Sequence, residues 1–384
     1  MPAGQLYDNI AAITAVGLIA VLAIYILPTM NFQNVKTVDE QQLINIAQNL
    51  LNSMLLDEGY PKRWGSYYPF NEDIVQSFGL ALSGADKLYV LDPDKVQKLV
   101  EDNPLGYISY KRIKSLLNLE DYDFCISIKP PFKVHVEDKS ISLQHLIFRI
   151  SVSDWDGRPI AGANVIATTT YCTGLGRGRG VIQLGTKETV NTTNSFGQCE
   201  IEQIISESNV IDAATVIYVS LHGLGTYAVV YQDPPPQNIA RINYVNETII
   251  LTQNGTPPPH AQVEIEKIFI YNYKGEIVWE YTGGQLDFIT YWTGEGDPPP
   301  GFKVWSKETD VKNPALIFFI FMATLPVEGR VPVLMAGPDP LWKGYRLTHF
   351  GSYPNQQATT VVVRRSVLIS GMTYIAELTL WKEI

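Results

Sequence analysis

The stretch LIFRISVSDWDGRPIAGANVIATTT, from Leu146 to Thr170, decides the fold class of this chain. Its first part, Leu146–Ser153, alternates apolar and polar side chains, which is the period of a strand with one buried face. Asp154–Pro159 then provides turn residues, and Ala163–Thr170 has the composition of the next strand. A second turn and further strand-like runs follow at Asn194–Gly197, Gln198–Ile205, Val216–His222 and Tyr227–Tyr231. Short strands at regular spacing, separated by Gly, Asn and Asp turns, predict a β-sandwich.

Two segments of this region are similar to those of known β-sandwich modules. ISVSDWDGRPIAGANV (Ile150–Val165), followed by TTNSFGQCEI (Thr192–Ile201), resembles the Ig-like and carboxypeptidase-regulatory-like β-sandwich modules of extracellular proteins. The resemblance covers about residues 145–231 and implies a sandwich fold there. It leaves the function open, because this architecture carries many unrelated roles.

Composition narrows the class of protein. The chain has 384 residues, with 39 acidic and 29 basic side chains, a formal net charge of −10. Hydrophobic residues make up 46% and charged residues only 18%, which excludes a disordered chain. The acidic balance also argues against nucleic acid as a partner, because nucleic-acid binders carry clustered Lys and Arg.

An apolar run near the N-terminus predicts a membrane anchor. Ile10–Leu27 (IAAITAVGLIAVLAIYIL) is uncharged over 18 residues and ends at Pro28, near the minimum length that spans a bilayer. The preceding MPAGQLYDN has no Lys or Arg, so an uncleaved anchor is favoured over a secretory signal peptide. A buried core helix is disfavoured, because the run has no polar face.

Three N-x-[ST] triplets favour an extracellular location for the bulk of the chain. They begin at Asn191, Asn246 and Asn254, which are predicted glycosylation sites. We therefore expect a single-pass protein of the cell membrane, with most of the chain extracellular at the cell surface or in a filament.

The predicted fold class is mainly β with an N-terminal α part, in four segments. Residues 1–30 form the membrane anchor helix, and residues 31–130 form an α-rich unit beside the membrane. Residues 131–256 form the Ig-like sandwich with a Pro-rich link, and residues 257–384 form a C-terminal β-rich domain.

Within the α-rich unit, Thr37–Glu40 has the capping-box form and predicts a helix that runs to Asp57. Its apolar residues recur with the 3.6-residue period of an amphipathic helix. Short helices are predicted over residues 72–82, 94–100 and 107–117, and a strand over residues 124–128.

In the C-terminal segment, Lys274-Gly275 separates two alternating runs, Val263–Tyr271 and Ile277–Tyr281, and predicts a hairpin. Leu316–Leu325 (LIFFIFMATL) is too short for a second membrane span and predicts a buried strand. Thr359–Ile384 predicts a hairpin in the core, because an exposed apolar hairpin would template aggregation.

A second resemblance comes from the N-terminal layout. One hydrophobic helix, an amphipathic continuation ending in GYPKRWG (Gly59–Gly65) and a β-rich C-terminal half resemble archaeal membrane-anchored surface proteins of the type IV pilin-like kind. Ala3–Leu6 resembles part of a prepilin-peptidase site, whose cut would follow Gly4, but it lacks the charged residue before that glycine. Cleavage and retention of the N-terminus both stay open.

The cysteines support one pairing. Cys172 and Cys199 lie 27 residues apart in the predicted sandwich, on strands that can be neighbours. The oxidising environment outside the cell then predicts a disulfide between them. Cys125, in an apolar strand, is the expected buried free thiol. The alternative is three buried thiols.

Motifs for catalysis are missing from the sequence. It contains no H-E-x-x-H, G-x-S-x-G or Walker A pattern, and the histidines stand without metal-ligand spacing. They are His135, His145, His222, His260 and His349. Gly174–Gly180 predicts a flexible loop with two solvated arginines, and Asp154 with Asp156 predicts a polar turn rather than a calcium site. We therefore predict no catalytic residue, metal or cofactor.

The leading hypothesis is a non-enzymatic, membrane-anchored extracellular protein that serves adhesion or cell-envelope assembly through its β-sandwich domains. Its expected partners are membrane lipid around the N-terminal helix, other envelope or filament subunits, and a glycan. The alternatives are a structural subunit of a pilus-like filament and an accessory subunit of a membrane enzyme complex.

Overall fold

The computed structural model describes most of the chain from residue 40 to residue 382. The gaps are residues 69, 102, 104, 175–182, 233–239, 254–261, 273–275, 284–288, 291–302, 313, 315, 326–328, 338–347 and 355–358. The predicted anchor at residues 10–27 lies outside the described residues. Among the helices that the structure does describe, none is long and apolar enough to cross a membrane.

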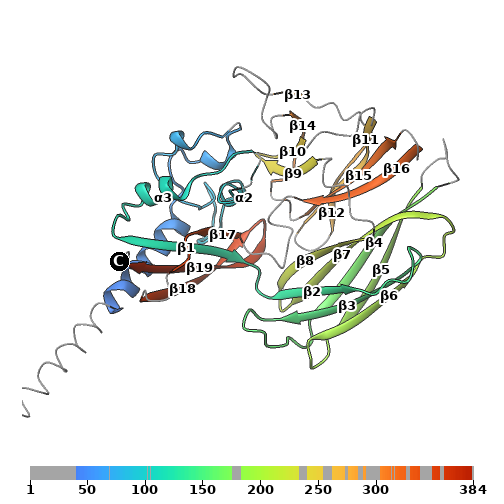
Figure 1. The fold of residues 1–384 in the computed structure, drawn as a ribbon, viewed down its shortest axis with the longest axis horizontal. Coiled ribbons are helices and arrows are strands. Elements are labelled where there is room, and N and C mark those ends of the chain that lie inside the picture. The colour runs from blue at the N-terminus through green and yellow to red at the C-terminus, as the bar shows by residue number, and fades with distance from the viewer. Residues whose placement is uncertain are drawn as a thin grey trace, which may run out of the picture.

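The first described helix covers residues 40–56 (Figure 1). Its apolar stripe is buried against the protein. Ala47, Leu51 and Met54 are almost completely buried, which confirms the amphipathic helix from residue 40 onward. The other helical elements are short. They are η1 (Trp64–Ser66), η2 (Glu72–Ile74), α2 (Pro93–Gln97) and α3 (Tyr110–Leu116).

The helix predicted over residues 72–82 was wrong beyond its first turn. After η2 the chain is extended, and isolated bridges join Tyr60 to Ser77 and Ala81 to Leu91. The amides of Gln76 and Ser77 both donate to the Tyr60 carbonyl, so they are not available for helical bonds.

Strands make up most of the described chain. They are β1 (Tyr122–Lys129), β2 (Lys133–Asp138), β3 (His145–Ser153), β4 (Asn164–Thr173), β5 (Gln183–Thr192), β6 (Gln198–Ile204), β7 (Val210–Leu221), β8 (Leu224–Tyr231), β9 (Ala240–Val245), β10 (Thr248–Gln253), β11 (Gln262–Tyr271), β12 (Ile277–Thr282), β13 (Ile289–Thr290), β14 (Lys303–Glu308), β15 (Leu316–Leu325), β16 (Gly329–Gly337), β17 (Thr348–Gly351), β18 (Thr360–Ile369) and β19 (Met372–Lys382). The prediction of a mainly β chain with a small N-terminal α part is confirmed.

The first sandwich packs the sheet β2-β3-β6 against the sheet β5-β4-β7-β8. Alternate residues of β3 are buried in its core, including Leu146, Phe148 and Ile150. The alternation that predicted the β-sandwich therefore corresponds to one buried and one solvated sheet face.

The second sandwich packs the sheet β13-β14-β10-β9 against the sheet β12-β11-β15-β16. The antiparallel pairing of β11 with β12 confirms the predicted hairpin. Ile249, Ile268 and Phe319 are fully buried between the two sheets.

A third group, the terminal sheet, has the order β17-β1-β19-β18. The β18–β19 hairpin lies in the core as predicted, and Ala376 and Leu378 are fully buried. Ile126 of β1 pairs with Leu378 of β19, so the α-rich part and the C-terminal hairpin share one sheet (Figure 1).

One apolar cluster, here called the shared core, joins all three groups. It contains Met54 from the helix over residues 40–56, Leu378 from the terminal sheet, and Ala214 from the outer face of the first sandwich. Phe318 of β15 contributes from the second sandwich, while its neighbour Phe319 faces that sandwich's own core. The sandwiches therefore pack back to back across the shared core.

We predict that Phe318→Ala lowers the free energy of unfolding by about 3–5 kcal/mol, because it leaves a cavity where the groups of strands meet. Chemical denaturation measures the loss. The control is Val362→Ala, at an exposed position of β18, which should change stability by less than about 0.5 kcal/mol. Equal, small effects of both variants would show that the shared core does not stabilise the fold.

Candidate functional site

Three hollows of the described surface lie on the α-rich unit. One of about 300 Å³, here called the junction pocket, is lined by Asp92 and Asp94 together with Asn246 of the β9–β10 turn. A groove of about 650 Å³ follows the end of the helix over residues 40–56. A third hollow, of about 450 Å³, lies beside Tyr60 and Tyr67.

The junction pocket is built on α2, a short helix with buried charges. Asp92 caps the helix by accepting a hydrogen bond from the Asp94 amide at 2.9 Å, and Pro93 occupies the first turn. Gly65 of η1 lies against this helix, where a Cβ would come within 2.5 Å of the Lys95 nitrogen. The approach is to the backbone of Lys95. The side chains of Lys95 and Lys98 are at most 1% exposed.

Both buried ammonium groups have partners. Lys95 Nζ donates to the carbonyls of Glu58 (2.9 Å) and Ala81 (2.7 Å) and lies 3.6 Å from Asp92 Oδ2. Lys98 Nζ donates to the Leu105 carbonyl at 2.7 Å and lies 4.9 Å from the centre of the Phe70 ring. These bonds offset part of the cost of burying the charges and hold the surrounding loops together.

The same helix ties the α-rich unit to the second sandwich. Asp94 Oδ2 accepts from Ser66 Oγ at 2.6 Å and from the Asn246 amide at 3.1 Å. Gln97 Nε2 donates to the Tyr244 carbonyl at 3.1 Å. Asp94 therefore bonds to both walls of the junction pocket.

Burial controls the protonation of this site. It raises the pKa of Asp94 to about 6, and the nearby charge of Asp92 adds to the shift. Burial also raises the pKa of Asp92, and it lowers the pKa of Lys98 to about 7. The carboxylate pair can thus hold a proton at mildly acidic pH, at the point where two units meet.

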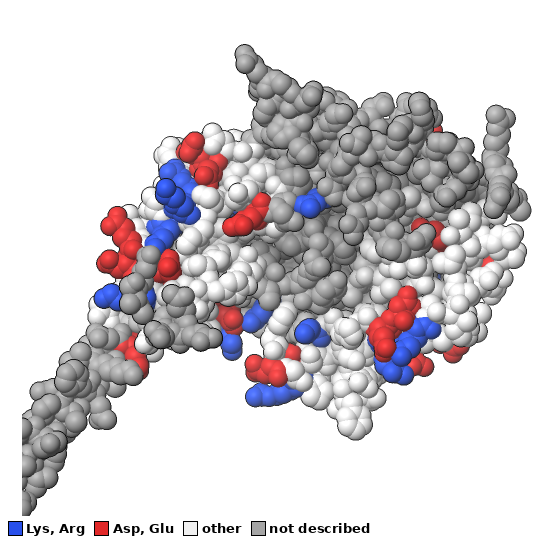
Figure 2. Space-filling model, in the orientation of Figure 1, with Lys and Arg blue, Asp and Glu red and all other residues white. Residues whose placement is uncertain are grey.

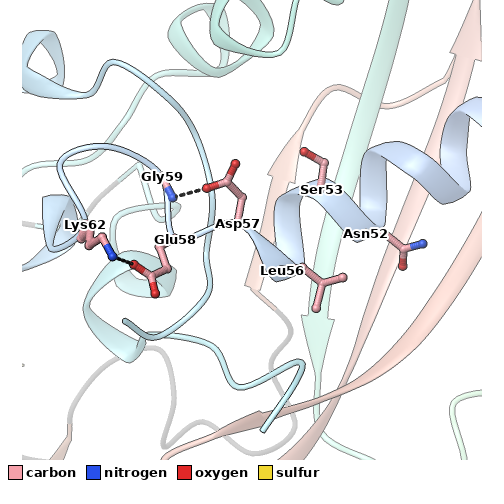
Figure 3. Close-up of a pocket in the computed structure, with 7 residues that line it drawn as sticks. All are labelled: Asn52, Ser53, Leu56, Asp57, Glu58, Gly59 and Lys62. Atoms are coloured by element: carbon pink, nitrogen blue, oxygen red, sulfur yellow. Dashed lines mark hydrogen bonds and ion pairs between the residues drawn. The ribbon is translucent and has the colours of Figure 1, made fainter. Parts of the chain in front are cut away.

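The groove at the end of the helix over residues 40–56 is more exposed (Figure 3). Glu58 and Lys62 form an ion pair of 3.0 Å, and Asp57 Oδ1 accepts from the Gly59 amide at 2.8 Å. Leu56 is 40% exposed beside them. Because Glu58 and Lys62 pair with each other across the turn, this groove resembles an ordinary solvated loop.

The predicted disulfide between Cys172 and Cys199 is not formed, and all three cysteines are buried free thiols. Cys172 faces the shared core, whereas Cys199 faces the core of the first sandwich. Successive side chains of a strand point to opposite faces, and it is Tyr171, not Cys172, that faces β6. The two sulfurs therefore lie on opposite sides of the sheet that contains β4.

Cys125 has a neighbour that the sequence did not indicate. Its Sγ lies 3.2 Å from Nδ1 of His349, on the paired strand β17, and the His349 ring stacks on Tyr353 at 4.4 Å. Burial raises the pKa of Cys125 to about 11, helped by the charge of Glu377, and burial lowers the pKa of His349. The pair therefore rests as neutral thiol and neutral imidazole at physiological pH.

Two of the three predicted glycosylation sites lie within the described residues. Asn191 is exposed on β5, and its Nδ2 donates to the Glu200 carbonyl at 2.7 Å. Asn246 is exposed in the β9–β10 turn at φ 49°. Asn254 lies outside the described residues.

The other residues considered as possible metal or ligand sites do not form a common site among the described residues. Asp154 Oδ1 accepts from the amides of Asp156 and Arg158, which confirms a polar turn. His145 forms a 2.6 Å contact with Glu202. His260 and residues 175–180 of the glycine-rich loop lie outside the described residues. Within the described part of the chain, no group of three or more His, Cys, Asp or Glu residues is placed to hold a metal ion.

The sequence did not point to the junction pocket. The Asp92-Pro93 pair indicates a helix start, but polar side chains such as those of α2 are usually solvated. Their burial depends on Gly65 and the β9–β10 turn, which are distant in sequence, so no local signal was available.

We predict that Asp94→Asn removes a pH dependence of stability. The pKa of Asp94 rises from 3.8 to about 6 on folding, so its contribution is fully present below pH 3.8 and is lost as pH rises through about 6. At pH 7 the variant should be about 1–3 kcal/mol more stable than the native chain, and the difference should vanish near pH 4. Denaturation curves from pH 4 to 8 measure it.

The control for this experiment is Asp156→Asn, which removes an exposed carboxylate. Its curve should run parallel to that of the native chain. An Asp94→Asn curve that also runs parallel would contradict a raised pKa of Asp94 in the folded chain.

We also predict three titratable thiols per chain. Protein purified without reductant and unfolded in guanidinium should react with three equivalents of Ellman's reagent, because all three cysteines are free thiols in this fold. The folded protein should react far more slowly, since Cys172 is fully buried. Reaction of only one equivalent after unfolding would show that two of the cysteines are joined in a disulfide.

Comparison with known proteins adds no family. No protein-family model and no curated protein matches the chain. Among solved structures it is similar to trypsin-activated alpha-2-macroglobulin from Escherichia coli, with 11% identity and a TM-score of 0.22, over 62% of this chain and 18% of that one. It is also similar to invasin, a bacterial integrin-binding protein, with 12% identity and a TM-score of 0.18, over 64% of this chain and 54% of that one. The chain spans less than two thirds of either protein, and TM-scores this low assign it neither a family nor an activity.

Proposed function

We propose that the chain is a non-enzymatic, membrane-anchored extracellular protein that serves adhesion or cell-envelope assembly. The observation that carries this proposal is the single body formed by the α-rich unit and both sandwiches around the shared core. A body of this kind holds its surfaces at fixed positions relative to one another, as a protein that presents binding surfaces requires.

The position of the apolar run supports this arrangement. Ile10–Leu27 precedes the helix over residues 40–56, which packs at the end of the molecule that holds the terminal sheet (Figure 1). In this proposal the α-rich unit lies next to the membrane. The partners in this proposal are membrane lipid at residues 10–27, other envelope subunits, and a glycan.

The charge distribution agrees with these partners. On the face drawn in Figure 2, Lys and Arg side chains lie beside Asp and Glu, with wide uncharged areas between them. Among the described residues drawn on this face, Lys and Arg do not gather into a basic surface of the kind that attracts nucleic acid. The exposure of Asn191 and Asn246 is compatible with glycosylation outside the cell.

We predict that deleting Met1–Pro28 releases the protein from membranes, because the apolar run of bilayer length is removed. The full chain should sediment with membranes in high salt, and the truncated chain should stay in the supernatant. A matched full-length variant carries Ile19→Arg and Leu22→Arg. It should also lose membrane retention, since each arginine costs about 2.5–3.5 kcal/mol at the centre of a span. Sedimentation of the truncated chain in high salt would contradict the anchor.

A further inference from the structure

An uncharged hollow with two exposed aromatic rings lies on the α-rich unit. Its volume is about 450 Å³, and it is lined by Tyr60, Pro61, Tyr67, Asn71, Ile74 and Gln76. The tyrosines are 57% and 47% exposed, although large aromatic side chains are usually buried more deeply. We call this site the tyrosine hollow.

The backbone around the tyrosine hollow is held in place. The Tyr60 amide donates to the Ser77 carbonyl at 3.1 Å, and the Gln76 amide donates to the Tyr60 carbonyl at 2.8 Å. Beneath them, Trp64 is fully buried, and its Nε1 donates to the Gly79 carbonyl at 3.0 Å. The backbone that carries Tyr60 and Gln76 is therefore fixed, which lowers the entropy cost of binding a ligand there.

Two amide side chains form the polar part of the lining. Asn71 Oδ1 accepts from the Asp73 amide at 3.0 Å, which orients the side chain and leaves its Nδ2 to donate. Gln76 is exposed and offers both a donor and an acceptor. No lining residue carries a charge.

These features define the chemistry of a ligand. A sugar ring has an apolar C–H face, which packs on an aromatic ring, and a rim of hydroxyl groups, which pair with amides. A lining without charge gives no compensation for a phosphate or a carboxylate. A hollow of this size has room for one or two sugar rings. Proline-rich peptides also use aromatic grooves, but Asn71 and Gln76 fit neighbouring hydroxyls better than a proline helix, whose backbone offers acceptors without N–H donors.

We propose that the tyrosine hollow binds a neutral sugar at an exposed part of a glycan. The inference rests on the proposed function, for which it names a ligand class and a site. It places recognition on the α-rich unit rather than on the Ig-like sandwich.

The experiment uses the full chain, made in a host without N-glycosylation and kept in a detergent without a sugar headgroup. The protein is applied to an array of immobilised neutral and acidic oligosaccharides, with a proline-rich peptide on the same surface. The neutral oligosaccharide with the strongest signal is then titrated in solution by calorimetry. Membrane sedimentation of the same preparation tests the anchor separately.

Three variants distinguish a loss of binding at the tyrosine hollow from a loss of folding. Tyr67→Ala removes a ring and should weaken binding at least tenfold, whereas Tyr67→Phe keeps the ring and should stay within about threefold of the native affinity. The matched control is Phe196→Ala, at a 75% exposed aromatic residue in the β5–β6 turn of the first sandwich. It should bind as the native chain does, and unfolding curves confirm that each variant is folded.

Each outcome decides the proposal. Binding of neutral oligosaccharides that depends on Tyr67 supports it. An empty array, binding only of the peptide or of acidic sugars, or binding that Tyr67→Ala leaves unchanged would overturn it. If the full chain still sediments with membranes in those cases, the proposal of a membrane-anchored protein is kept and only the proposed sugar site is rejected.

Discussion

The burial of β15 on both faces is the constraint on which the rest of the structure depends. Ile317, Phe319 and Phe321 point into the second sandwich, and Phe318 and Ile320 point into the shared core. A strand covered on one side only would leave one of these rows in water. The back of the second sandwich must therefore be covered, and Ala214 and Val216 of the first sandwich help to cover it. Two hydrogen bonds reinforce this interface: the Ala336 amide donates to Tyr231 Oη at 2.8 Å, and Tyr227 Oη donates to the Asn272 carbonyl at 2.5 Å.

The terminal sheet closes the body from the other side. Because β1 pairs with β19, the α-rich unit completes its sheet only after the last strand of the chain is made. Contacts of such long sequence separation are slow to form, and the hairpin of β18 and β19 is the local element that β1 can join.

The junction pocket and the tyrosine hollow both involve the α-rich unit, but they differ in burial and charge. The buried ion pairs and hydrogen bonds of α2 hold the junction of this unit with the second sandwich, and Asp94 makes that junction sensitive to protonation. The tyrosine hollow lies open on the surface, is uncharged and has a fixed backbone at Tyr60 and Gln76. The first feature connects two units and contains a carboxyl whose burial opposes its ionisation, and the second is exposed to solvent.

The sequence by itself determined many of the local elements, although not the conformation of residues 75–82. Alternation in Leu146–Ser153, the apolar stripe of the helix over residues 40–56 and the run Leu316–Leu325 each follow from side-chain period, which depends only on neighbours in the chain. It did not determine which face of a strand meets which core. A shift of one residue places Tyr171 rather than Cys172 in the sandwich core, so the expected disulfide does not form. Burial of Lys95, the approach of Cys125 to His349 and the pairing of β1 with β19 were decided by tertiary structure alone, because each joins segments whose contact is selected by the packing of the whole body.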